Sequence, residues 1–224
     1  MKRGARLAIF TALLGVAVAL VVMTSMAFLR TEPPTVDYVT SANSRQPVNL
    51  TLQTVGAIGY GDNPGWVSYL AREPQGKWVQ STLWDLPAHT RINVTIYQFD
   101  SGSPLRNPQR GEVTGVLNPT LNGARISLLD AASGNGVGHT FSVPSLGINV
   151  PLWGVNGNAK NFCNQPAPCP LSAAHNTVKF SFVTPGVGQY RWQCFVPCGL
   201  GYLYGNGGPM STLGYMGGFL KVVA

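Results

Sequence analysis

Four cysteines, arranged as two close pairs, are the residues of this chain with the clearest capacity for chemistry. Cys163 and Cys169 flank a proline-rich segment, and Cys194 and Cys198 follow nearer the C-terminus. A thiolate binds soft metal ions, whereas two neighbouring thiols can also join in a disulfide, above all in an oxidising compartment. For Cys163 and Cys169 the proline-rich loop favours a local disulfide over metal binding.

Cys194 has a different setting, because it ends an apparent strand over 189–194 and a glycine-rich loop follows it. A thiolate at a strand end, with Met or His later in the loop, allows a rigid β-sandwich to hold copper, since soft sulfur ligands suit Cu(I). A disulfide between Cys194 and Cys198 is an equally weighted alternative, provided that the loop bends.

The elements that must position these residues are predicted to be β-strands. Apolar and polar residues alternate over 48–53, 92–97 and 178–182, which is typical of half-buried strands, and a last strand is expected over 219–224. The 27 Gly and 17 Pro disfavour a helical bundle. We therefore predict an antiparallel sandwich or barrel, with long loops or insertions over 101–136 and 154–174.

An uncharged stretch from Leu7 to Leu29 is long enough to cross a bilayer as a helix. Lys2, Arg3 and Arg6 precede it, and such basic flanks stay on the cytoplasmic side. We predict a single-pass anchor over 1–30, a stiff linker over 31–47 and an external domain over 48–224, at the cell membrane on its extracytoplasmic side. The alternative is a cleaved signal peptide, because small residues at 25 and 27 suit cleavage.

The charges and motifs outside the anchor exclude several classes of function. Eleven basic and 8 acidic residues lie beyond Arg30 without forming a basic cluster, so nucleic acid is not expected as a partner. Neither a Gly-x-Ser-x-Gly elbow nor a His-Glu-x-x-His pair occurs, which argues against hydrolytic chemistry.

Three segments resemble copper proteins of the cupredoxin superfamily. The segment 138–147, GHTFSVPSLG, resembles the part of cytochrome oxidase subunit II that carries its first copper-ligating histidine, and 193–199, QCFVPCG, resembles its two-cysteine loop. The closing segment 214–222, GYMGGFLKV, is similar to the end of rusticyanin and sulfocyanin, which are blue-copper carriers. The resemblance implies a cupredoxin-like Greek-key β-sandwich or barrel.

The resemblance also implies a copper ligand set of His139, Cys194, Cys198 and Met216, with Met210 as a substitute for Met216. Two features depart from subunit II: Tyr202 stands where a second histidine follows the cysteines, and Val196 replaces the acidic residue between them. A complete binuclear site is therefore not expected. Two thiolates, one imidazole and one thioether would suit a single Cu(I) ion. Without the motif, His139 would be equally well explained as a buried, hydrogen-bonded core residue.

These observations favour an electron-transfer role beside the catalytic subunit of a heme-copper terminal oxidase, with no substrate chemistry of its own. A soluble electron carrier would be a second partner. The alternative is a copper-free, disulfide-stapled scaffold in a membrane complex of the quinol-oxidase type, and copper storage or delivery is a third reading.

Overall fold

A computed structural model describes residues 3–30, 32–39, 46–61, 63, 65–199 and 208–224. The chain divides into two compact units, Met1–Glu32 and Pro33–Ala224. The first unit contains helix α1 (Arg3–Arg30) and the second contains the β-strands.

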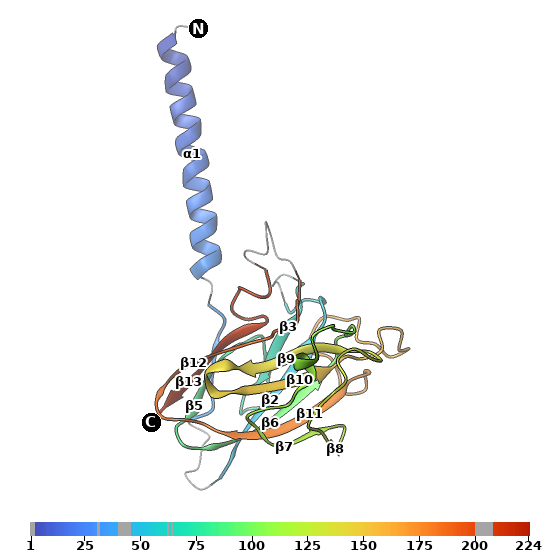
Figure 1. Ribbon diagram of the computed structural model, residues 1–224. Coiled ribbons are helices and arrows are strands. Elements are labelled where there is room, and N and C mark those ends of the chain that lie inside the picture. The colour runs from blue at the N-terminus through green and yellow to red at the C-terminus, as the bar shows by residue number, and fades with distance from the viewer. Residues whose placement is uncertain (1–2, 31, 40–45, 62, 64, 200–207) are drawn as a thin grey trace. The chain divides into compact units, whose positions relative to one another are not determined.

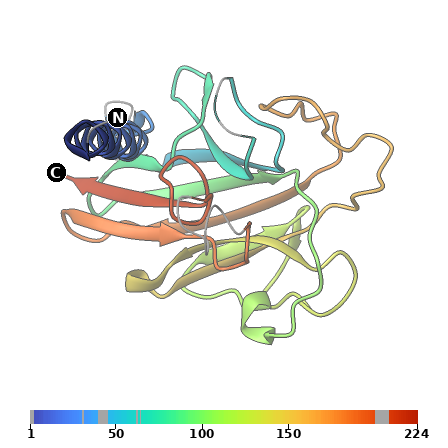
Figure 2. The same ribbon diagram turned by 90° about the horizontal axis from the view of Figure 1, so that it is seen from above.

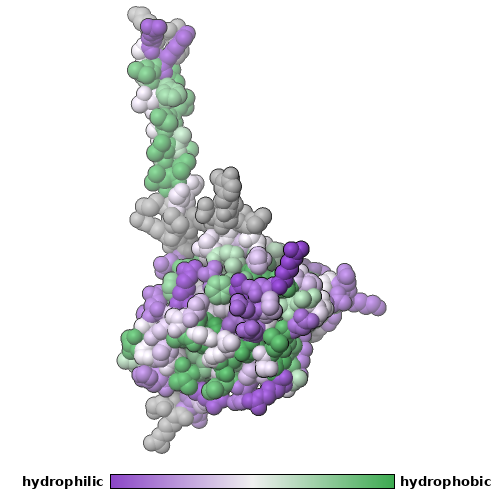
Figure 3. All heavy atoms as spheres, in the orientation of Figure 1, coloured by the Kyte–Doolittle hydropathy of each residue, from purple (hydrophilic) through white to green (hydrophobic). Residues whose placement is uncertain are grey.

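Helix α1 carries an apolar span from Arg3 to Ser25, 23 residues that are long and apolar enough to cross a membrane. Its described side chains are all exposed, and Figure 3 shows the apolar ones as a green band along the face of the helix in view. The span contains no proline, and the hydroxyls of Thr11 and Thr24 donate to the carbonyls of Leu7 and Leu20. Such internal satisfaction of polar groups is what a hydrocarbon environment requires.

The second unit is a two-layer β-sandwich (Figures 1 and 2). One sheet has six strands, in the spatial order β1 (Thr35–Asp37), β5 (Leu83–Pro87), β13 (Gly217–Val223), β12 (Gly188–Gln193), β9 (Val137–Val143) and β10 (Ile148–Trp153). The other has seven, in the order β4 (Trp78–Val79), β3 (Ser68–Arg72), β2 (Val48–Val55), β6 (Arg91–Gln98), β11 (Asn176–Val183), β7 (Leu117–Leu121) and β8 (Ala124–Arg125).

Most neighbouring strands are antiparallel, but β2 with β6, β1 with β5 and β5 with β13 pair in parallel. A parallel pair needs a connection that leaves the sheet and returns. Between β2 and β6 the chain does so by crossing to the opposite sheet, where it forms β5. The all-β Greek-key sandwich with one N-terminal apolar helix is therefore confirmed, with some parallel pairs among the antiparallel strands.

The core lies between the sheets and is built by alternating inward side chains. In β6, Ile92, Val94 and Ile96 are buried while their neighbours are partly exposed, as the alternation predicts. Trp84 and Trp192 stack with ring centroids 4.8 Å apart at the centre of the core. These two fully buried indoles make the frame stiff beside the residue pair Gln193 and Cys194.

Two segments differ from the sequence prediction. The stretch 31–47, expected as a linker, contributes β1 to the six-stranded sheet, and Val36 and Tyr38 are buried in the core. The stretch 101–136, expected as a loop, contains β7, β8 and the 3-10 helix η1 (Pro108–Gly111). These elements are short, and their apolar and polar residues alternate too weakly for them to be recognised in the sequence. A second 3-10 turn, η2 (Pro144–Leu146), joins β9 to β10.

Candidate metal centre

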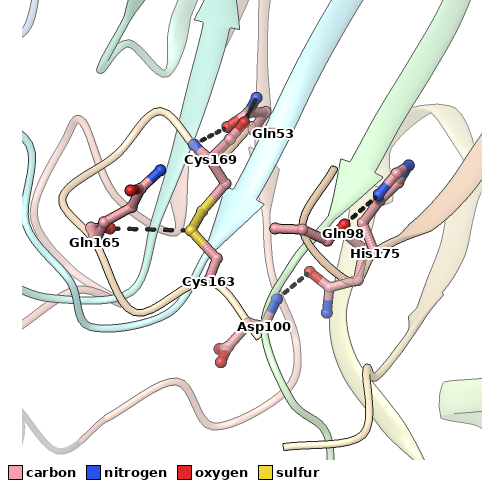
Figure 4. The surroundings of a disulfide bond; sticks show 8 residues. Gln53, Gln98, Asp100, Cys163, Gln165, Cys169 and His175 are labelled. Carbon is pink, nitrogen blue, oxygen red and sulfur yellow. Dashed lines mark hydrogen bonds between the residues drawn. A yellow bond between two sulfur atoms is a disulfide. The ribbon is translucent and has the colours of Figure 1, made fainter. Parts of the chain in front are cut away.

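The first cysteine pair forms a disulfide, Cys163–Cys169, as predicted (Figure 4). It closes the segment 163–169 within the loop 154–174, which has no strand. Gln53 of β2 holds this loop, because its side-chain amide donates to the Cys169 carbonyl and its side-chain oxygen accepts from the Cys169 backbone N–H, both at 3.0 Å. These two sulfurs are therefore structural and unavailable to a metal ion.

Adjacent strands bring the second pair next to a histidine. His139 lies on β9, and Cys194 directly follows β12, which is a neighbour of β9 in the six-stranded sheet. The Cys194 backbone N–H donates to the Met216 carbonyl at 2.8 Å, just before β13 begins. Pairing of these strands thus places residues from distant parts of the sequence at one end of the sandwich.

The three side chains point their donor atoms at one another. The imidazole Nδ1 of His139 lies 3.0 Å from Sγ of Cys198 and 3.8 Å from Sγ of Cys194. The two sulfurs are 3.3 Å apart and not bonded. His139 is 2% exposed, Cys194 0% and Cys198 8%. Three of the predicted ligands therefore form one compact group that is shielded from water.

Backbone groups surround the sulfurs and fix the loop that carries them. The Val196 carbonyl lies 3.1 Å from Sγ of Cys198 and 3.6 Å from Sγ of Cys194. On the other side, the Thr140 backbone N–H points at Sγ of Cys194 at 3.3 Å. The Phe195 backbone N–H donates to the Thr140 hydroxyl at 2.8 Å, which ties the loop to β9. Val196 lacks the acidic side chain of the resembled family, but its carbonyl still faces both sulfurs.

Asp100 is a site residue that the sequence analysis missed. Its Oδ2 lies 3.0 Å from Nε2 of His139, the ring nitrogen remote from the thiols. Asp100 comes just after β6, and the chain then crosses to the other sheet, where Ser103 bridges to Val137 of β9. No sequence signal indicates this contact, because an aspartate in a turn is ordinary and only the crossing between sheets brings it to His139.

The site is electrostatically polarised. Burial lowers the pKa of His139, but hydrogen bonds to Asp100 and Cys194 and their negative charges outweigh it and raise the pKa to about 9. Burial raises the pKa of the Cys194 thiol, yet hydrogen bonds from Cys198 and His139 hold it well below its usual value. The hydrogen bond to Cys194, together with burial, raises the pKa of Cys198. The lowered pKa of Cys194 favours its thiolate form, which is the form of cysteine that binds soft metal ions.

The methionines and the remaining histidines are placed as follows. Met216 is fully buried and adjoins Cys194 through its backbone carbonyl, while half-buried Met210 accepts from the Gln193 amide at 3.4 Å. Ligation by either thioether stays a prediction. His89 is exposed, and His175 packs on Tyr97 and Phe99, away from the group. Tyr202 lies outside the described residues.

The donor set fits a soft metal ion. One nitrogen and two sulfurs lie within 4.8 Å of one another, all buried, and sulfur and imidazole ligands of this kind suit Cu(I). A hollow lined by Trp66, Asp100, His139, Cys198 and Pro209 borders two of the three donors. The three residues thus form a ligand set, and two of them, His139 and Cys198, also line a hollow in the surface.

Neither a protein-family model nor a curated protein matches the chain. Among solved structures, one of the copper protein rusticyanin shares 15% identity, covering 91% of this chain and 94% of that chain, with a TM-score of 0.37. Rusticyanin from Thiobacillus ferrooxidans gives 15% identity over 90% of this chain and 92% of that chain, with a TM-score of 0.36. These similarities are distant.

Proposed function

We propose that this chain is a membrane-anchored, cupredoxin-like electron-transfer protein with an atypical copper site formed by His139, Cys194 and Cys198. The observation that carries the proposal is the convergence of three soft donor atoms, buried within 4.8 Å of one another. A single buried cysteine is often only a small apolar core residue, but two thiols that converge on an imidazole, with shifted pKa values, are typical of a functional site.

The roles of the chain's own residues follow from their positions. Cys194 and Cys198 supply sulfur, and Nδ1 of His139 faces both of them. Strand β9 carries His139 and Cys194 directly follows β12, so the sandwich would limit movement of these donors when bound copper changes oxidation state. Bound copper would supply one-electron transfer between Cu(I) and Cu(II). Met216 is proposed as a further, potential-tuning ligand because its backbone adjoins Cys194.

The membrane location and the partners are part of the same proposal. Helix α1 has the length and apolarity of a membrane span, and basic residues precede it, which favours a C-terminal domain on the extracytoplasmic side. By resemblance to subunit II of heme-copper oxidases, the partner would be the catalytic subunit of a terminal oxidase, with a soluble carrier as a second partner. Oxygen reduction would belong to that catalytic subunit.

One observation favours the copper-free alternative, in which the chain is a disulfide-stapled scaffold. The sulfurs of Cys194 and Cys198 already lie 3.3 Å apart, so oxidation would need only a small movement to join them. The two functions differ in the state of these thiols and in copper content.

The test is copper loading of the full-length protein in detergent micelles, with free thiols counted on the protein as isolated. We expect stoichiometric copper and, once the bound copper is oxidised to Cu(II), a visible thiolate-to-copper absorption that Cys194→Ser abolishes. His139→Gln should also abolish it, whereas the matched change His175→Gln should leave it intact. A colourless protein with no copper and no free thiols would contradict the proposal and support the scaffold.

A further inference from the structure

Asp100 and the two thiols lie on opposite sides of the His139 ring. Nε2 faces Oδ2 of Asp100 at 3.0 Å, and Nδ1 faces Sγ of Cys198 at 3.0 Å. A neutral imidazole carries one proton, on one nitrogen or the other. An ionised carboxylate can only accept a hydrogen bond, so its partner nitrogen must be the one that carries the proton.

We propose that Asp100 is a positioning residue of the copper site: it holds the proton of His139 on Nε2 and so presents the Nδ1 lone pair to a metal ion beside Cys194 and Cys198. This inference rests on the proposed copper function and names a residue that tunes it. Metal-ligating histidines generally need such a partner, which orients the ring and strengthens it as a ligand.

The carboxylate is itself held in place. Its Oδ1 accepts from the Ser101 backbone N–H at 2.8 Å, and the Asp100 backbone carbonyl accepts from the Val155 N–H at 2.9 Å. The Asp100 backbone N–H in turn donates to the side-chain oxygen of Gln98 at 3.4 Å, a contact drawn in Figure 4. Both carboxylate oxygens therefore have partners, and the one that faces His139 has a defined position.

The charge of Asp100 is directed at the site. Within the part of the chain that the structure describes, its only ion pair is the one with His139, and its side chain is 17% exposed. No described lysine or arginine neutralises it. A negative charge next to the ligand favours the more positive oxidation state of a bound metal and so lowers its reduction potential.

Two variants test the inference from different directions. In Asp100→Asn the side-chain amide can donate to Nε2, which would move the histidine proton to Nδ1, the nitrogen that faces the thiols. In Gly56→Ala the carboxylate remains, but the added methyl group would lie 3.0 Å from Oδ1 of Asp100 and within 4 Å of no side chain or backbone other than Asp100. The second variant therefore displaces Asp100 without removing its charge.

The matched control is Asp85→Asn. Asp85 lies on β5, and its side chain is similarly exposed, at 21%. It pairs with Lys221 of β13 at 3.7 Å. It undergoes the same chemical change without contact with His139.

The experiment uses the full-length protein in detergent micelles and the Cu(I) ion as the probe. We expect Asp100→Asn to weaken Cu(I) binding about 10- to 100-fold in a chelator competition and to raise the reduction potential. Gly56→Ala should weaken binding by a smaller factor, and Asp85→Asn should bind as the wild type does. The ¹⁵N shifts of the His139 ring in the metal-free protein, recorded above its pKa of about 9 so that the imidazole is neutral, should report a proton on Nε2 in the wild type and on Nδ1 in Asp100→Asn.

The outcomes separate this inference from the proposed function. If the wild type takes up no copper, both are overturned. If the wild type binds copper and Asp100→Asn and Gly56→Ala keep its affinity and potential, only the role of Asp100 is overturned. Should Asp100→Asn fail to fold, as thermal unfolding would show, Gly56→Ala decides alone.

Discussion

At the scale of single residues, the hydroxyl of Thr140 ties the loop that carries Cys194 and Cys198 to β9. Thr140 follows His139 on β9, is buried, and accepts hydrogen bonds from the Phe195 backbone N–H and the Ser142 hydroxyl. Its own backbone N–H points at Sγ of Cys194. One residue therefore links the histidine strand to both the sulfur and the backbone of the loop.

Thr140→Val keeps the shape of this side chain but removes the acceptor for Phe195. Because a backbone N–H would lose its partner, we expect the free energy of unfolding to fall by about 1–3 kcal/mol, and copper affinity to fall with it. Chemical denaturation and Cu(I) competition measure the two effects. Thr140→Ser retains the hydroxyl and should restore copper affinity, and a valine variant with wild-type stability and affinity would show that the hydrogen bond is dispensable.

At the scale of elements, the disulfide loop and the candidate metal centre are held by different strands. Gln53 of β2 fixes the loop, whereas β9 and β12 position His139 and Cys194. The two cysteine pairs should therefore respond independently to substitution.

Replacing Cys163 and Cys169 together by serine should lower the free energy of unfolding by about 2 kcal/mol, because the closed loop is short. Copper stoichiometry should stay unchanged, since neither sulfur reaches the metal centre. Denaturant titration and metal analysis check both parts. A loss of copper from this double variant, with the protein still folded, would contradict the separation of the two sites.

Strand β1 has an effect beyond its three residues. It pairs in parallel with β5, Tyr38 donates its hydroxyl to the Arg72 carbonyl at 2.7 Å, and Val36 is buried at 2% exposure. Residues 35–38 are therefore part of the folded sandwich, and they link the edge of the six-stranded sheet to β3 of the other sheet.

A fragment that starts at Pro33 should accordingly be more stable than one that starts at Val48. The shorter fragment leaves the edge of β5 unpaired and loses the buried side chains of Val36 and Tyr38, so we expect a loss of at least about 2 kcal/mol. Thermal unfolding of the two fragments measures the difference. Equal stability would mean that β1 contributes nothing to the core.

At the scale of the whole molecule, the apolar helix and the sandwich have separate tasks. None of the helix side chains described, those of residues 3–25, is buried, whereas the sandwich has its own core and forms a compact unit. We expect the full-length chain to fractionate with membranes and the fragment 33–224 to be soluble and to bind copper.

Orientation is the second property of the whole molecule. A C-terminal alkaline phosphatase fusion, which is active only outside the cytoplasm, should be active when attached to the full-length chain, because the basic residues precede the helix. Exchanging Lys2, Arg3 and Arg6 for neutral residues and placing them after residue 30 should reduce that activity. An inactive fusion on the unaltered chain would contradict the proposed location.

The sequence by itself determined the features that depend on local chemistry. Alternating apolar residues predict β2, β6 and β11 because side chains of a strand point to opposite faces. The uncharged run predicts α1 from its length alone. His139, Cys194 and Cys198 were identified from segments that resemble copper proteins, and the structure brings all three together.

Only the tertiary structure decided which groups surround those donors. Asp100 meets His139 because the chain crosses between the sheets after β6, and Thr140 meets Phe195 because β9 and β12 are neighbours. Strand β1 likewise acquires its role from pairing with β5. Hydrogen bonds act over about 3 Å, whereas these partners lie far apart along the chain, so local sequence patterns carry no record of them.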